Sequence, residues 1–199
     1  SKSIVSLKEP TVPPVKLQLT KEPMKFVMLP ANARKRHPIV EKRMEELTRF
    51  AETFPENRIE SGDKRVGIIT SGISYEYAKE IMPEASYLKL GMVYPLPKEM
   101  IRSFASRVEK LFVVEELDPF IEDQVRTMGI EVSGKDLFPL CGELTPGLVA
   151  KGLKGLPLPA PDETYKGLPG RPPIMCPGCP HRGIFSILSK LKLFVTGDI

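Results

Sequence analysis

The sequence predicts an α/β fold, a small doubly wound and mostly parallel sheet with helices on both faces. Across residues 66–136, short apolar runs alternate three times with amphipathic helical segments. Short connections in such an alternation favour parallel strands joined by right-handed crossovers. The runs at 66–70 and 110–115 do not alternate apolar and polar residues, as expected for strands that are buried on both faces. The chain has 199 residues, 41% of them hydrophobic, which is enough for one packed core.

The first predicted strand, 66–70, contains Val, Ile, Ile and Thr and ends at a tight Ser71-Gly72 turn. The helix after it carries Ile73, Tyr77 and Ile81 on one face. A second strand, 87–93, follows.

A second helix starts at Pro97, and its apolar face leads to the third strand, 110–115. Asp118 is the expected cap of a third helix, with Pro119 at its first position and Gly129 near its end. Residues 130–132 are then predicted to be a short fourth strand. Ligands of such sheets bind beyond the carboxyl ends of the strands.

Proline, with 21 residues, dominates both flanks of this α/β region. Residues 1–65 are predicted to be an extended linker plus one amphipathic helix at about 38–54, opened by Pro38. Residues 66–150 are the expected α/β domain, and 151–173 are a Pro- and Gly-rich linker. A helix with Ile184 to Leu191 on one face and a strand at 193–196 follow the linker.

The net charge of +4 is unevenly distributed along the chain. Residues 1–65 contain 14 Lys and Arg against 9 Asp and Glu, residues 66–150 contain 8 against 13, and residues 151–199 contain 7 against 3. An acidic folded region with basic flanks argues against a nucleic-acid-binding module. The chain shows neither a membrane-spanning run nor a secretory signal pattern, so the sequence predicts a cytoplasmic protein with no membrane partner.

Cys176-Pro177-Gly178-Cys179-Pro180-His181 is the strongest chemical motif of the sequence. Two thiols in a Pro/Gly turn can bind one metal ion or one iron of a cluster. Two ligands are half of a site, however, and Cys141 lies far upstream beyond the proline linker. A pair of ordinary thiols in a loop therefore stays open as the alternative.

Other residues at predicted strand or helix ends have either a structural role or a role in ligand binding or catalysis. His181, before a helix, is either a structural hydrogen-bonding group or a contact to an anion. Gly72 belongs to no phosphate-binding fingerprint, which favours a turn that requires its conformational freedom. Glu115 and Glu116 are expected to cap a helix or form ion pairs rather than to catalyse. Asp198, after an apolar strand, could hold Mg²⁺ against a diphosphate.

The order of these motifs resembles the alpha subunit of indolepyruvate:ferredoxin oxidoreductases, members of the 2-oxoacid:ferredoxin oxidoreductase family. The resemblance rests on residues 171–182 around the two cysteines and on Thr196-Gly197-Asp198-Ile199. Residues 28–38 and 113–122 look like the same subunit. The resemblance implies that the chain is an internal fragment, in which 66–150 is similar to a transketolase C-terminal domain. It implies that 174–199 begins a thiamine-diphosphate-binding domain.

The resemblance also implies a reaction and its cofactors. The family oxidatively decarboxylates aryl pyruvates with CoA to aryl-acyl-CoA and CO₂, and reduces ferredoxin. It uses thiamine diphosphate, Mg²⁺ and iron–sulfur clusters. The implied partners are the remainder of the alpha subunit, the beta subunit and ferredoxin, with CoA and the aryl pyruvate as substrates.

By the same resemblance, His181, Gly197 and Asp198 are expected to bind the cofactor, with Asp198 as the Mg²⁺ ligand. Cys176 and Cys179 are expected iron–sulfur ligands. No catalytic residue is assigned within these 199 residues, and the fragment alone is expected to be inactive and to bind no cofactor. Two alternatives stay open: a non-catalytic docking module, and an independent metal-binding domain that uses the cysteine pair.

Overall fold

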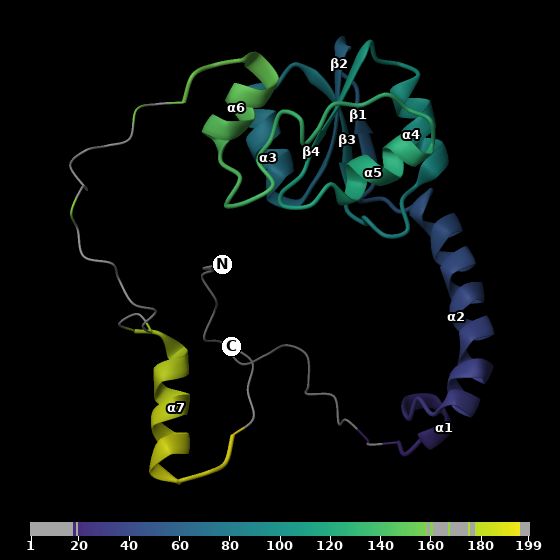
Figure 1. Cartoon of the computed structure of the whole chain (residues 1–199), viewed down its shortest axis with the longest axis vertical. Helices are drawn as coiled ribbons and strands as arrows, with labels where there is room; N and C mark the ends of the chain where they lie inside the picture. The colour runs from purple at the N-terminus through teal and green to yellow at the C-terminus, as the bar shows by residue number, and fades with distance from the viewer. Residues whose placement is uncertain are drawn as a thin grey trace. The chain divides into compact units, whose positions relative to one another are not determined.

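The computed structural model describes residues 18, 20–158, 160, 167, 175 and 178–195. The chain divides into two compact units between residues 158 and 159. The first unit contains a four-stranded sheet and its helices, and the second contains helix α7, Pro180–Lys190 (Figure 1). Among the described residues, no helix is both long and apolar enough to cross a membrane.

The sheet is mostly parallel, which confirms the predicted fold class. Its strand order is β1-β3-β2-β4. Strand β2 (Asp63–Ser71) is central and pairs in parallel with β3 (Ala85–Leu90) and β4 (Lys110–Val114). Strand β1 (Arg58–Glu60) was not predicted, and it pairs antiparallel with β3.

Helices cover both faces of the sheet, as in a doubly wound fold (Figure 1). Ile69, Leu88 and Val113 pack in the cluster that includes helices α4 (Lys98–Ala105) and α5 (Phe120–Thr127). Their chain neighbours Ile68, Tyr87 and Val114 pack in the opposite cluster, which includes α3 (Gly72–Ile81) and α6 (Pro146–Lys154). Because successive strand residues face opposite sides, burial of both faces explains the continuous apolar runs.

The predicted fourth strand at 130–132 is wrong as a strand and is reduced to a single parallel bridge between Phe112 and Ser133. The Val113 amide donates to the Ser133 carbonyl at 2.9 Å, and the Ser133 amide donates to the Leu111 carbonyl at 3.1 Å. Gly129, at φ 76°, begins this segment, and Gly134 turns away from it directly after the bridge. The pairing is therefore confined to the residues around Ser133.

The N-terminal helix is longer than predicted and is placed earlier in the chain. Helix α2 spans Pro30–Ala51 and contains Pro38, whereas the sequence predicted a helix at about 38–54 that opens at Pro38. An internal proline removes one hydrogen bond and costs a helix about 3 kcal/mol. A short helix, α1 (Pro23–Phe26), precedes α2. Helix α2 ends where the buried Asn57 side chain donates to the Ala51 carbonyl at 2.8 Å.

Helix α6 lies partly in the predicted linker 151–173. Its start has two common features of a helix amino end: the Thr145 hydroxyl accepts from the Leu148 amide at 3.3 Å, and Pro146 is the first helical residue. Gly155 ends it in the left-handed conformation, at φ 67°. Gly155, one of the glycines that suggested a linker, is therefore the end of a helix. Assignment of 66–150 and 174–199 to domains of the family stays a prediction.

Candidate functional site

A cavity of about 250 Å³ lies at the carboxyl edge of the parallel sheet, where the sequence predicted ligands to bind. Strand β2 ends at Ser71, and α3 begins at the next residue, Gly72, whose φ of 54° satisfies the expected turn. Strand β4 is followed by Glu115 and Glu116, and α5 begins shortly after them. The cavity is lined by Ser71, Gly72, Ile73, Ser74, Val93, Glu115, Glu116, Phe120 and Ile121.

Glu115 is a helix cap, which confirms the structural interpretation made from the sequence. Its buried carboxylate accepts from the amides of Ile121 at 2.8 Å and Glu122 at 2.9 Å, at the start of α5. Burial raises the pKa of Glu115 above its ordinary value, although these two amides oppose the change. The Asp118 side chain, predicted to cap this helix, makes no such hydrogen bond, and Pro119 precedes the first helical residue, Phe120.

Two further carboxylates hold the loops around this edge. Glu116 accepts from the Leu144 amide at 2.7 Å. Glu122, which is buried, accepts from the Lys135 amide at 2.8 Å and pairs with Arg126 at 2.6 Å. The Lys135 ammonium in turn donates to the Glu115 carbonyl at 2.6 Å. These acidic side chains hold the start of α5 and the neighbouring loops at this edge.

The rim of the cavity is apolar and exposed. Of its lining residues, Ile73 at the start of α3 and Phe120 at the start of α5 are 53% and 48% exposed. The neighbouring loop residues Tyr94 and Leu117 are 62% and 57% exposed. Leu117 adopts a positive φ of 61°, which is uncommon for a side chain of this kind. The Tyr94 and Phe120 rings are 6.2 Å apart. The arrangement can hold an apolar or aromatic group over a floor of serine hydroxyls and carboxylates.

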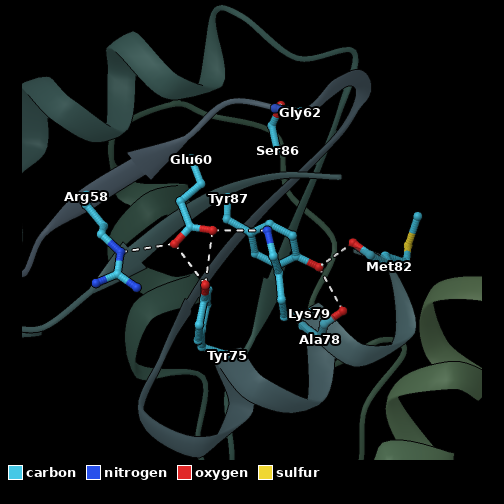
Figure 2. A network of polar contacts seen from close by, with 9 residues as sticks. All are labelled: Arg58, Glu60, Gly62, Tyr75, Ala78, Lys79, Met82, Ser86 and Tyr87. Atoms are coloured by element: carbon cyan, nitrogen blue, oxygen red, sulfur yellow. Dashed lines mark hydrogen bonds and ion pairs between the residues drawn. The ribbon is translucent and has the colours of Figure 1, made fainter. Parts of the chain in front are cut away.

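A second polar cluster, centred on Glu60, fastens the edge strand β1 to helix α3 (Figure 2). The Glu60 carboxylate accepts from Arg58 Nε at 3.0 Å, from the Tyr75 hydroxyl at 2.8 Å and from Lys79 Nζ at 3.0 Å. Partial burial alone raises its pKa, but hydrogen bonds from Lys79, Tyr75 and Arg58 outweigh burial and lower the pKa to about 2. Glu60 is therefore ionised at neutral pH.

Tyr87 and Ser86, on the adjacent strand β3, complete this cluster (Figure 2). The buried Tyr87 hydroxyl lies 2.7 Å from the Ala78 carbonyl and 2.8 Å from that of Met82, so it can donate to the end of α3. Burial raises the pKa of Tyr87. The Ser86 hydroxyl accepts from the Gly62 amide at 3.0 Å. Sequence reasoning missed this cluster, and its signal was the Arg-Ile-Glu alternation just before Ser61-Gly62.

The predicted cofactor residues lie in the second unit, and the structure describes only two of them. Cys179 directly precedes α7 and is partly buried with a free thiol. His181 is the second residue of α7, is exposed, and its ring lies 6.3 Å from that of Phe185. Cys176, Gly197 and Asp198 fall outside the described residues. The expected proximity of His181 and Asp198 therefore stays a prediction.

The segment after α7 differs from the expectation. The sequence predicted a strand at 193–196, but residues 193–195 form no strand, and residue 196 is outside the described part. A strand requires a paired neighbour, and the second unit has none among its described residues. The described residues also contain no group of three or more His, Cys, Asp or Glu side chains that could hold a metal ion.

Comparison with known proteins identifies relatives that match most of the chain. No family model matches it. It is 37% identical over 195 residues to the indolepyruvate oxidoreductase subunit IorA of Archaeoglobus fulgidus, which covers 88% of this chain and 31% of that protein. It is also 37% identical over 193 residues to IorA of Thermococcus kodakarensis, covering 85% of this chain and 30% of that protein.

The chain is also similar to a solved structure, with a TM-score of 0.48 and 20% sequence identity. That structure is the 2-oxoglutarate:ferredoxin oxidoreductase from Magnetococcus marinus with 2-oxoglutarate, CoA and succinyl-CoA bound. That match covers 64% of this chain and 24% of the other. The chain spans about 30% of the length of the IorA relatives. Identity at this level across most of the chain confirms the resemblance inferred from the motifs: the chain belongs to the family of indolepyruvate oxidoreductase IorA subunits.

Proposed function

We propose that the chain is part of a thiamine-diphosphate-dependent enzyme that oxidatively decarboxylates aryl pyruvates of the indolepyruvate class. The products are CO₂ and, with CoA, an aryl-acyl-CoA, and the electrons pass to ferredoxin. The observation that carries this proposal is the 37% identity to an IorA subunit over 88% of the chain. The beta subunit and the rest of the alpha subunit are the proposed partners.

The side chains present fit the proposed cofactors by their chemistry. Asp198 provides a carboxylate oxygen, the ligand type that Mg²⁺ prefers. His181 is exposed in the first turn of α7, where its ring can donate a hydrogen bond to an anion beside the helix amides. The thiols of Cys176 and Cys179 are suitable iron ligands, but two thiols are half of a cluster site. Thiamine diphosphate, when bound, supplies the electron sink for decarboxylation.

The α/β unit has a supporting role in this proposal. Its polar groups at the carboxyl edge are used as caps and loop anchors, and the rim around them is apolar. Such a surface can shield a reacting centre from water without taking part in bond making. We therefore place catalysis in the complete enzyme and expect the 199-residue chain alone to be inactive.

Reconstitution of the complete enzyme tests the proposal. The full-length alpha subunit, expressed with its beta subunit, should reduce ferredoxin when supplied with indolepyruvate, CoA, thiamine diphosphate and Mg²⁺. In this enzyme, Asp198→Ala should abolish Mg²⁺-dependent cofactor binding in calorimetry, whereas Asp118→Ala should leave it unchanged. An Asp198→Ala enzyme that binds the cofactor normally contradicts the assignment of this carboxylate.

Histidine variants test the second cofactor residue with an internal control. His181→Ala should weaken cofactor binding by about 1–3 kcal/mol if the ring donates a buried hydrogen bond in the complete enzyme. His37→Ala is the matched control, since His37 is the other histidine of the chain and pairs with Glu41 on the surface of α2. Equal cofactor affinity and turnover in both variants would leave His181 with a structural role only.

The cysteine pair separates the oxidoreductase proposal from an independent metal-binding domain. Metal analysis of the 199-residue chain should give no stoichiometric zinc or iron, because Cys176 and Cys179 supply only two ligands. The variant Cys141→Ser, at an exposed cysteine outside the motif, is the control. Tight stoichiometric metal that is lost in Cys179→Ser and kept in Cys141→Ser would favour the metal-binding alternative.

A further inference from the structure

Helix α2 has very little of its surface covered within the described part of the chain. Of its 22 residues, only Asn32 and Ala51 are buried. Ile39 is 49% exposed and Val40 is 39% exposed, both near the middle of the helix. A helix of this length spans about 33 Å, and most helical stability in proteins comes from packing of an apolar face. Pro38, inside the same stretch, removes one helical hydrogen bond.

The carboxyl end of α2 is nevertheless fixed to the α/β unit by side chains. The Glu52 carboxylate accepts from the amides of Glu99 and Met100, both at 3.0 Å, and so caps α4. Asn57 is buried, and its side-chain oxygen accepts from the amides of Gly91 at 2.9 Å and Met92 at 3.0 Å. The direction in which the helix leaves the sheet is therefore set by hydrogen bonds rather than by a free hinge.

The amino end of α2 carries further uncovered apolar residues, contributed by α1 and the turn after it. The Asn32 side chain donates to the Val27 carbonyl at 2.9 Å, which holds α1 against the start of α2 (Figure 1). Five neighbouring side chains are 50–66% exposed: Met24, Phe26, Val27, Met28 and Leu29. Together with Ile39 and Val40 they form what we call the arm surface, defined by these seven residues. Exposed apolar side chains gathered in this number on one segment mark an interaction site.

The charge beside the arm surface defines its partner more closely. Arg34, Lys35 and Arg36 lie in the first two turns of α2, whose first turn contains no acidic residue. The segment 30–40 around these three cations contains no acidic side chain. None of the three forms an ion pair with another described residue. A surface that complements both features combines apolar side chains with carboxylates.

We propose that the arm surface docks on the part of the full-length alpha subunit that lies outside these 199 residues, at an apolar patch bordered by Asp or Glu side chains. The chain spans about 30% of the length of IorA subunits, so most of the subunit is available as a covalently tethered partner. Tethering gives such a partner a high effective concentration compared with a second molecule. The proposal depends on membership of this family and not on the catalytic activity.

Hydrogen exchange of the full-length alpha subunit, compared with the 199-residue chain, tests this docking. Amides of residues 39–47 should exchange at least about tenfold more slowly in the full-length subunit, because docking raises the local opening free energy. Amides of α5 should exchange equally in both proteins, since Glu115 caps that helix from within the α/β unit. Equal exchange of residues 39–47 in the two proteins overturns the proposal.

Substitutions identify the surface and the occupant. In the full-length subunit, Ile39→Asp and a charge reversal, Arg36→Glu, should each return the exchange of residues 39–47 towards the rate in the 199-residue chain. Leu140→Asp is the control: Leu140 is also exposed, at 53%, but lies outside the arm surface, so this variant should leave the exchange of residues 39–47 unchanged. If light scattering shows a dimer of the 199-residue chain in which α2 is protected in a concentration-dependent manner, a second copy covers the arm surface and the proposal is wrong. Because no step measures turnover, these outcomes are independent of whether the complete enzyme oxidises aryl pyruvates.

Discussion

Replacing Glu60 by glutamine should destabilise the α/β unit at neutral pH and have much less effect in acid. The folded protein lowers the pKa of this carboxyl from its ordinary value of 4.5 to about 2. At about 1.4 kcal/mol per pKa unit, this difference corresponds to about 3 kcal/mol. Arg58 and Lys79, two of its three partners, are 45% and 35% exposed. Solvent screening of such pairs reduces the expected contribution to about 1–2 kcal/mol.

The direction of the pH dependence follows from the lowered pKa. A carboxyl with a lower pKa in the folded state binds its proton more weakly there than in the unfolded state. Its contribution is complete above the ordinary value of 4.5 and is lost as the pH falls towards about 2. The free energy of unfolding of the parent chain should therefore fall between pH 5 and pH 2.5 by about 1–2 kcal/mol more than that of Glu60→Gln.

Urea unfolding followed by circular dichroism, at several pH values across this range, measures both proteins. Asp63, whose pKa is also lowered through its hydrogen bonds with Arg65, is present in both proteins, so its contribution cancels in their difference. Glu76→Gln is the matched control, because Glu76 is an exposed residue of α3 outside the cluster. If Glu60→Gln and the parent chain keep the same difference in unfolding free energy from pH 7 to pH 2.5, the assignment of the cluster is wrong.

Two further stability predictions and one binding prediction complete the set. Gly62→Ala should destabilise the unit by about 1–3 kcal/mol, since an added Cβ would overlap the carbonyl oxygens of Glu84 and Ala85. Gly147→Ala is the control, because its added Cβ meets only ordinary contacts, and urea unfolding measures the stability of both variants. Asn57→Ala should cost about 2–4 kcal/mol in the same assay, because it leaves three backbone groups without their partner; a loss below 0.5 kcal/mol would contradict the anchoring of α2. Calorimetric titration of the 199-residue chain with thiamine diphosphate and Mg²⁺ should show no binding, and a micromolar isotherm would indicate a site not identified above.

The central strands and helices could be predicted from sequence because their signals are local. The runs containing Ile68 and Val113 are apolar on successive residues, and the helices between them repeat apolar residues at helical spacing. Strand β1 could not be found in this way, since three residues with charged ends carry no apolar run. Its pairing with β3 is a tertiary contact across 31 residues of sequence, Arg58 with Lys89.

The remaining differences between the predicted and observed elements come from residues that do not follow their usual structural preference in this fold. Pro38 usually opens or breaks a helix, yet here it lies inside α2. Gly155 suggested a linker but ends α6 in a left-handed conformation. At the site, Asp118 is of a residue type that often caps helices, but the buried Glu115, directly after β4, accepts from the amides of Ile121 and Glu122 instead. Which of two acidic neighbours caps a helix depends on the path of the loop, which the sequence does not specify.

The short antiparallel strand β1 has a consequence for the solubility of the unit. A long parallel sheet with an open edge can recruit another extended chain and start aggregation. Here one edge is closed by three residues, two of which are charged. Glu60 is hydrogen-bonded to Tyr75 and Lys79 of α3, and Arg58 is hydrogen-bonded to Glu60. On the opposite edge, Ser133 forms two backbone hydrogen bonds with β4, around Phe112. Loss of the Glu60 cluster would therefore do more than lower stability, because it would release β1 and expose β3 as a template for intermolecular pairing.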